Sequence, residues 1–121
     1  MEKKIIAIDF DGVIVEESFP IIGKLMDGAA KTIKDLNEAG YTLILWTNRT
    51  NEYSDENGKP GNYLDKAIKF LKENNLYHLF YKINENVADK YNCRKVYADI
   101  YIDDRDINGF QGWDNVRNKL L

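Results

Sequence analysis

The 121-residue sequence is poor in the residues that build disulfides and zinc sites, since it has one cysteine, Cys93, and one histidine, His78. A single cysteine excludes a disulfide within the chain and is typical of a reducing compartment. One cysteine and one histidine cannot supply the ligand cluster of a zinc site. The sequence also lacks an apolar run long enough to cross a membrane. We therefore expect a cytoplasmic protein with no membrane partner.

The chain also has no large excess of charge of either sign. The chain has 17 basic and 20 acidic residues and a formal net charge of −3. Bulk electrostatics therefore does not indicate nucleic-acid binding. The hydrophobic share of 44% and the charged share of 31% are ordinary for a globular protein. The length predicts one domain, residues 1–121, around a single core.

The sequence alternates short apolar runs with amphipathic stretches. The apolar runs predict strands over residues 4–9, 41–46, 80–83 and 98–102. Apolar residues at helical spacing predict a helix from Asp27 to Gly40, a second from Asn62 to Asn74, and a short one within 111–121. This order predicts an α/β fold, namely a three-layer, doubly wound, Rossmann-like and mostly parallel sheet with helices on both faces.

The first strand leads directly into two acids. Four apolar residues are followed by Asp9, Phe10, Asp11 and Gly12. Ligands of open parallel sheets bind just beyond the carboxyl ends of the strands, which is where Asp9 would lie. Two acids at that edge repel each other unless a cation or a shared proton offsets their charge. Gly12 allows a sharp turn or a close approach to a ligand.

Two further strands end in polar residues. Thr47 and Asn48 follow the second predicted strand, and Asp103 and Asp104 follow the last one. In a parallel sheet these ends share one edge with Asp9, so several carboxylates should gather there. Mg²⁺ is the expected counter-ion, because it takes oxygen ligands and is often bound by one or two carboxylates together with phosphate.

The same edge could hold a phosphate group. The Thr47 hydroxyl and the backbone N–H groups of the turn at Asn48 suit phosphate oxygens. Lys95, shortly before the last strand, could add a point charge, with Lys90 as its rival. A carboxylate can act as the nucleophile and form an aspartyl-phosphate. Nucleophile, metal and fixed positive charge are the parts that phosphoryl transfer needs.

These residues resemble the four motifs of the haloacid dehalogenase superfamily, in the same order. The first is Asp9-Phe10-Asp11-Gly12 after an apolar strand, and the second is the strand that ends in Thr47. Lys95 resembles the third motif, and the acidic stretch 101–105 resembles the fourth. The connections 12–27 and 50–61, where a cap domain would be inserted, are too short to hold one. The chain therefore resembles the small, capless phosphatases of that superfamily.

The resemblance implies a magnesium-dependent phosphomonoester hydrolase. Asp9 would attack phosphorus, and Asp11 would act as general acid and then as general base. Thr47, Asn48 and Lys95 would bind the phosphate. Mg²⁺ would lie on Asp9, on the Asp11 carbonyl and on Asp103 or Asp104, and the residues leave open which of the two binds it directly.

Other interpretations remain open at this point. The acidic cluster, Thr47 and a lysine also suit a receiver-like phosphoacceptor module of a signalling system. A third hypothesis is a non-catalytic binding protein on the same fold. The phosphorylated partner could be a small molecule or a macromolecule, because an uncapped site accepts a large substrate. Alternatively, a second subunit of a homo-oligomer could cover the site.

Overall fold

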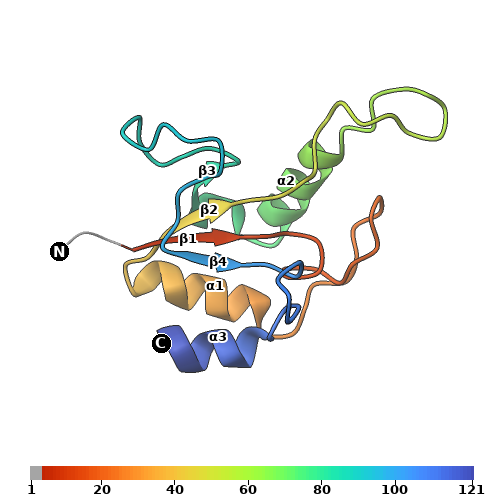
Figure 1. The fold of residues 1–121 in the computed structure, drawn as a ribbon. Coiled ribbons are helices and arrows are strands. Elements are labelled where there is room, and N and C mark those ends of the chain that lie inside the picture. The colour runs from red at the N-terminus through yellow and green to blue at the C-terminus, as the bar shows by residue number, and fades with distance from the viewer. Residues whose placement is uncertain (1–3) are drawn as a thin grey trace.

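The computed structural model describes residues 4–121 and shows an all-parallel sheet packed with helices (Figure 1). The strands run in the spatial order β3-β2-β1-β4. They are β1 (Ile5–Ile8), β2 (Thr42–Leu45), β3 (Phe80–Ile83) and β4 (Ile100–Ile102). The α-helices are α1 (Ala29–Glu38), α2 (Tyr63–Glu73) and α3 (Trp113–Leu120), and a short 3-10 helix, η1 (Tyr77–Leu79), precedes β3. The predicted Rossmann-like α/β fold without a cap domain is confirmed.

β1 is a central strand, and all four of its residues are buried. Ile6 lies opposite Leu43 of β2 on one side and Ile100 of β4 on the other. A strand buried on both faces has no need of polar residues at alternate positions, which explains the continuous run of Ile and Ala.

The strand order determines which face each connection crosses. β1, β2 and β3 follow one another in a single direction across the sheet, so right-handed crossovers place α1 and α2 on the same face. The chain then returns past β2 and β1 to reach β4. For the same handedness, this return must cross the opposite face.

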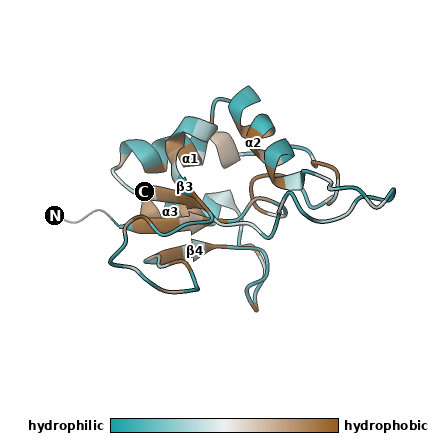
Figure 2. Ribbon diagram, turned by 90° about the horizontal axis from the view of Figure 1, so that it is seen from above, coloured by the Kyte–Doolittle hydropathy of each residue, from teal (hydrophilic) through white to brown (hydrophobic). Residues whose placement is uncertain are grey.

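The larger core cluster lies under the helices. It joins Ile6, Ile8, Leu43 and Leu45 of the sheet to buried residues of α1, α2 and α3, including Trp113. In Figure 2 the strands are hydrophobic, whereas α1 and α2 also carry hydrophilic residues. Burial of these apolar faces is the main source of stability in such a layered fold.

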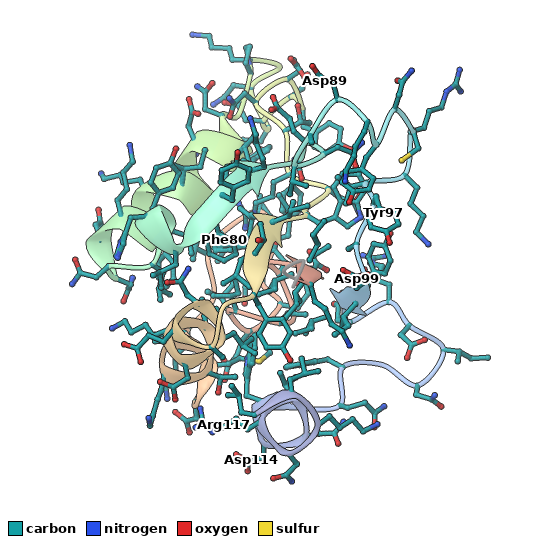
Figure 3. The ribbon with its side chains drawn as sticks, turned by 90° about the vertical axis from the view of Figure 1, so that its left-hand side faces the viewer. Phe80, Asp89, Tyr97, Asp99, Asp114 and Arg117 are labelled. Carbon is teal, nitrogen blue, oxygen red and sulfur yellow. The ribbon has the colours of Figure 1, made fainter. Side chains whose placement is uncertain are left out.

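The expectation of helices on both faces holds for one face only. The second face carries Ile5, Ala7 and Ile44, which pack with Val96 of the returning segment 84–99. No helix is present within 84–99. Viewed along the strands, the helices lie on one side of the sheet and the segment with Asp89 and Tyr97 lies on the other (Figure 3).

The helix boundaries lie close to the predicted ones, but the capping differs. The N-cap of α1 is Gly28, at φ 83°, rather than Asp27. Asn62 is the N-cap of α2 as predicted, yet its side chain makes no capping hydrogen bond, because its backbone is left-handed at φ 54°. α2 ends at Glu73, and its C-cap is Asn74, the residue at which the sequence predicted the end of the helix.

Among residues 4–121, no helix is long and apolar enough to span a bilayer.

Candidate functional site

A pocket lies at the carboxyl ends of β1, β2 and β4. Its volume is about 190 Å³. It lies next to the point where the strand order reverses between β1 and β4, the usual ligand position in open α/β sheets. The lining residues come from loops after these strands: Asp9, Asp11, Glu17, Phe19, Thr47, Asn48, Arg49, Tyr53, Asp104 and Arg105.

Three carboxylates meet at this edge. One oxygen each from Asp9, Asp103 and Asp104 lies within 4.8 Å of the other two, and all three residues are half-buried. The parallel register produces this meeting, because Ile8 lies opposite Ile102 and the next residues of both strands are acids. The Asp9 N–H donates to the Ile102 carbonyl at 2.9 Å and so ties the two strand ends together.

The cluster changes the acidity of Asp9. Burial raises the pKa of the Asp9 carboxyl from 3.8 to about 8, with help from the adjacent Asp104 carboxyl and the charge of Asp103. The Phe10 N–H, which donates to Asp9 Oδ1 at 2.7 Å, acts in the opposite direction. A proton therefore offsets part of the cluster's charge when no cation is present.

Asp104 has an oxygen with no partner in the described chain. Its Oδ1 is buried and accepts no hydrogen bond. A buried acceptor of this kind is costly unless an ion or a water binds it. Gly12 packs directly against the other oxygen, Oδ2, and a Cβ at position 12 would overlap it. Gly12 also has a φ of 82°, so both space and conformation require glycine here.

Hydrogen bonds to its backbone N–H and to its side-chain oxygen hold Thr47 in place at the pocket. Its N–H donates to Asn84 Oδ1 at 2.8 Å, and its Oγ1 accepts from the Arg49 N–H at 3.1 Å. Asn48 is exposed and lines the same pocket. Asn84, which sequence reasoning did not single out, follows β3 in the left-handed region at φ 54°. Asn is one of the few residue types that tolerate this conformation, and this is the one sequence signal that could have indicated Asn84.

Asp11 forms a bidentate ion pair with Arg49. Arg49 Nε lies 2.7 Å from Asp11 Oδ2, and Nη2 lies 2.8 Å from Oδ1. The guanidinium is buried and also donates to the carbonyls of Tyr63 and Ile21, both at 3.2 Å. This ion pair is buried, and it leaves no Asp11 oxygen free of the guanidinium.

Lys95 does not line the pocket. It is exposed on segment 84–99, and its Nζ lies 4.6 Å from the centre of the Tyr101 ring. Lys90 lies over Tyr91 of the same segment. Among residues 4–121, the cations that line the pocket are Arg49 and Arg105. A phosphate-binding role for Lys95 stays a prediction that this geometry does not support.

Phe19 and Tyr53 also line the pocket, although the sequence gave no reason to single them out. They lie on the two loops where a cap could have been inserted. Both side chains are largely exposed, at 41% and 51%. Exposed aromatic residues on loops are common in sequences, so only the position beside the acidic cluster distinguishes them.

The fold recurs in a protein of known structure. A conserved protein from Bacteroides thetaiotaomicron is 34% identical in sequence and superposes with a TM-score of 0.78, over 95% of this chain and 87% of that one. The chain belongs to the family of that protein. That relative is described as a conserved protein, so the similarity establishes the fold and the family and assigns no activity. No model of a protein family matches the sequence, and neither does any curated protein.

Proposed function

We propose that the protein is a magnesium-dependent phosphomonoester hydrolase that works through a phosphoaspartate on Asp9. The observation that carries this proposal is the meeting of the Asp9, Asp103 and Asp104 carboxylates, because Asp9 and Asp104 also line one pocket together with Thr47. A nucleophile, an acidic metal site and a hydroxyl for phosphate oxygens are then available together. This supports the activity that the superfamily resemblance implies.

The acidic cluster suits Mg²⁺ as its cofactor. All three donors are carboxylates, which are ligands for a hard cation, and neither cysteine nor histidine lines the pocket. Asp9, Asp103 and Asp104 would hold the ion, and the unpaired Asp104 Oδ1 is the oxygen whose burial a cation best explains. The ion would supply positive charge to the phosphoryl oxygens and would favour the ionised form of Asp9.

In the first step, a carboxylate oxygen of Asp9 attacks phosphorus. A bond forms between that oxygen and phosphorus, and the bond to the leaving oxygen breaks with its electron pair. The Thr47 hydroxyl donates to a phosphoryl oxygen, and Arg105 at the pocket wall contributes positive charge. The leaving oxygen takes up one proton, so the products are the free alcohol and the aspartyl-phosphate.

In the second step, Asp11 acts as the base. It removes a proton from a water molecule, the water oxygen bonds to phosphorus, and the bond to Asp9 breaks. The ion pair with Arg49 fixes the position of the Asp11 carboxylate at the pocket wall. To protonate the leaving group in the first step, Asp11 must carry a proton, so one of its oxygens must first separate from Arg49. The proton that Asp11 takes from water in the second step restores this protonated form for the next turnover.

A phosphatase assay with Asp9→Asn tests the proposal. Phosphate release from p-nitrophenyl phosphate should require Mg²⁺, stop in excess chelator, and fall at least about a thousandfold in the variant, because the nucleophile is gone. The matched control is Asp89→Asn, the same change on the exposed segment 84–99, which should keep wild-type activity. Full activity of Asp9→Asn would refute the mechanism.

A receiver-like phosphoacceptor is the second candidate, and the Asp11–Arg49 pair favours it. With both Asp11 oxygens paired, activation of water is hindered and a phosphoaspartate would last longer. Acetyl phosphate with Mg²⁺ should then label Asp9 stoichiometrically without continued phosphate release. Rapid multiple turnover in the same experiment would exclude this candidate.

A further inference from the structure

We infer that the pocket selects phosphomonoesters whose alcohol carries a flat, π-rich ring, which Phe19 and Tyr53 contact. This inference rests on the proposed function for the reacting end of the substrate. It adds a substrate class, which the acidic cluster and Thr47 leave open because they contact only the phosphate.

The two aromatic side chains line the same pocket as Asp9 and Asp104 of the acidic cluster. Phe19 keeps 41% of its surface exposed and Tyr53 keeps 51%. Their loops extend beyond the carboxyl ends of the strands (Figure 1). A ligand ring that covers these side chains removes apolar area from water and gains ring–ring contact.

Contacts within the protein order the Phe19 side of the pocket before any ligand binds. The ring lies 5.0 Å from the buried guanidinium of Arg49 and meets Tyr63 edge to face at 5.1 Å. Arg49 also donates a hydrogen bond of 3.2 Å to the carbonyl of Ile21, two residues after Phe19. Arg49 and Tyr63 therefore cover part of the Phe19 ring, and the exposed remainder of its surface can contact a ligand.

The Tyr53 side is held by a hydrogen-bonded hairpin. The Gly61 N–H donates to the Tyr53 carbonyl at 2.8 Å, and Ser54 pairs with Pro60. At the base of the hairpin, Asn51 Oδ1 accepts from the Asp65 N–H at 2.9 Å and so joins the loop to α2. A wall that is already ordered loses little entropy when a ligand binds.

The size of the pocket limits the alcohol. A volume of about 190 Å³ is below the 300–1,000 Å³ of sites for drug-sized ligands. It suits a phosphate with a single ring a bond or two away better than a phosphate with several linked rings. A simple aromatic alcohol has such a ring close to the phosphate, whereas a nucleotide carries its base beyond the sugar, so the nucleotide is the alternative source that the test must separate.

Matched substrate pairs separate these sources and test the inference. Benzyl and cyclohexylmethyl phosphate share a primary alkoxide leaving group and differ in the flatness of the ring. Adenosine 5′-phosphate and ribose 5-phosphate share the leaving hydroxyl and differ in the base. We expect kcat/KM for benzyl phosphate to exceed that of its partner by roughly threefold to tenfold, as ring–ring contact predicts. A preference confined to the nucleotide pair would assign the ring to a base instead.

Variants connect the preference to the two side chains. Phe19→Leu and Tyr53→Leu each keep an apolar side chain but remove the ring, and each should bring the ratio within a substrate pair toward one. If Phe19→Leu fails to fold, Tyr53→Leu alone decides. Tyr81→Leu is the control, because Tyr81 is 63% exposed on β3 and does not line this pocket. It should leave the ratio unchanged.

Binding to Asp9→Asn separates this inference from the proposed function. Calorimetry of the same pairs with Mg²⁺ should show the same preference without turnover. If no phosphomonoester is hydrolysed but benzyl phosphate binds more tightly, the phosphatase proposal fails and the ring selectivity stands. If both members of each pair are hydrolysed and bound equally, the ring selectivity is refuted and the phosphatase stands.

Discussion

At the scale of single residues, Arg49 connects more of the site than any acid does. Its guanidinium joins Asp11 after β1, Ile21 in the loop before α1, and Tyr63 at the start of α2. It also lies 5.3 Å from the ring centre of Phe10. A planar group with five donors suits this position, whereas lysine offers a single compact charge. Arg49 therefore joins the connection between β1 and α1, which carries both Asp11 and Ile21, to the start of α2 beside the pocket.

Arg49→Met should destabilise the protein strongly. The side chain is 1% exposed and its Asp11 partner 16%, so the change leaves a largely buried carboxylate without its partner. Removal of one partner of a buried pair costs about 3–5 kcal/mol in the free energy of unfolding. Urea denaturation followed by circular dichroism measures the loss.

The control is Arg117→Met, which makes the same substitution in an exposed pair. Arg117 Nη1 lies 2.8 Å from Asp35 Oδ2, and both side chains reach solvent. Solvent-exposed pairs contribute little, so the loss should be much smaller. Equal losses in the two variants would mean that the Arg49 pair is no more important than a surface contact.

The sequence predicted the acidic cluster but not the cations around it. Asp9, Asp103 and Asp104 meet because parallel strands end at a common edge, and this follows from topology alone. Arg49 and Lys95 lie on segments whose course depends on tertiary packing, and their local sequence carries no signal of it. For that reason the sequence did not indicate the buried pair of Arg49 with Asp11, and Lys95 was expected at the pocket, where the structure does not place it.

At the scale of elements, α3 supports the loop that follows β1. The indole Nε1–H of Trp113, the first residue of α3, donates to the Val13 carbonyl at 2.8 Å. Trp113 is buried and meets Phe110 edge to face at 5.5 Å. The helix at the end of the described chain thus holds the turn next to Gly12, and through it the position of Asp11.

Trp113→Phe should lower the free energy of unfolding by about 1–3 kcal/mol, because the buried Val13 carbonyl loses its indole donor. The comparison variant is Tyr41→Phe, which removes a 3.1 Å hydrogen bond from the Tyr41 hydroxyl to the Leu120 carbonyl at a half-buried position. Its loss should be smaller, because water can reach the group that is left behind. Thermal unfolding of the two variants side by side measures the difference.

Helices and strands were predictable from periodicity, whereas their caps were not. The strand at Phe80–Ile83 has the predicted bounds. Asp27 has the right residue type for an N-cap, but Gly28 takes the position because its left-handed backbone turns the chain into α1. Capping depends on the direction from which the chain arrives, and hydrophobic spacing does not encode that direction.

At the scale of the whole molecule, the site changes the number of protons that the native state binds. In the unfolded chain Asp9 has its ordinary pKa of 3.8, and in the folded chain its pKa is about 8. Between these pH values the native state therefore binds more protons than the unfolded state. Linkage then requires stability to decrease as the pH rises through this interval.

In the absence of divalent cations, the contribution of Asp9 to stability should be fully present below pH 4, fall between about pH 4 and pH 8, and level off above. Asp9→Asn should show a shallower fall, because the amide does not titrate. Mg²⁺ displaces the proton, so its stabilising effect should increase over the same interval. Urea midpoints across this pH range, with and without Mg²⁺, measure both effects. Parallel pH curves for the wild type and the variant would contradict the assignment.

The two faces of the sheet were not equally predictable. The helical face followed from the apolar spacing of α1 and α2, but the other face was expected to carry helices and carries segment 84–99 instead. This segment is held by local contacts: the Tyr91 and Tyr97 rings stack at 4.4 Å, and Asn86 Oδ1 accepts from the Tyr97 N–H at 2.6 Å. Such pairings depend on the course of the loop, and no periodic pattern reports them.

The lone thiol of the chain lies on that same segment. Cys93 is free and exposed, on the face of the sheet away from the helices and outside the lining of the pocket. A maleimide dye or a surface linker would therefore attach at one defined point without entering the acidic edge. The protein can be immobilised or followed by fluorescence through its native cysteine, with no engineered attachment site.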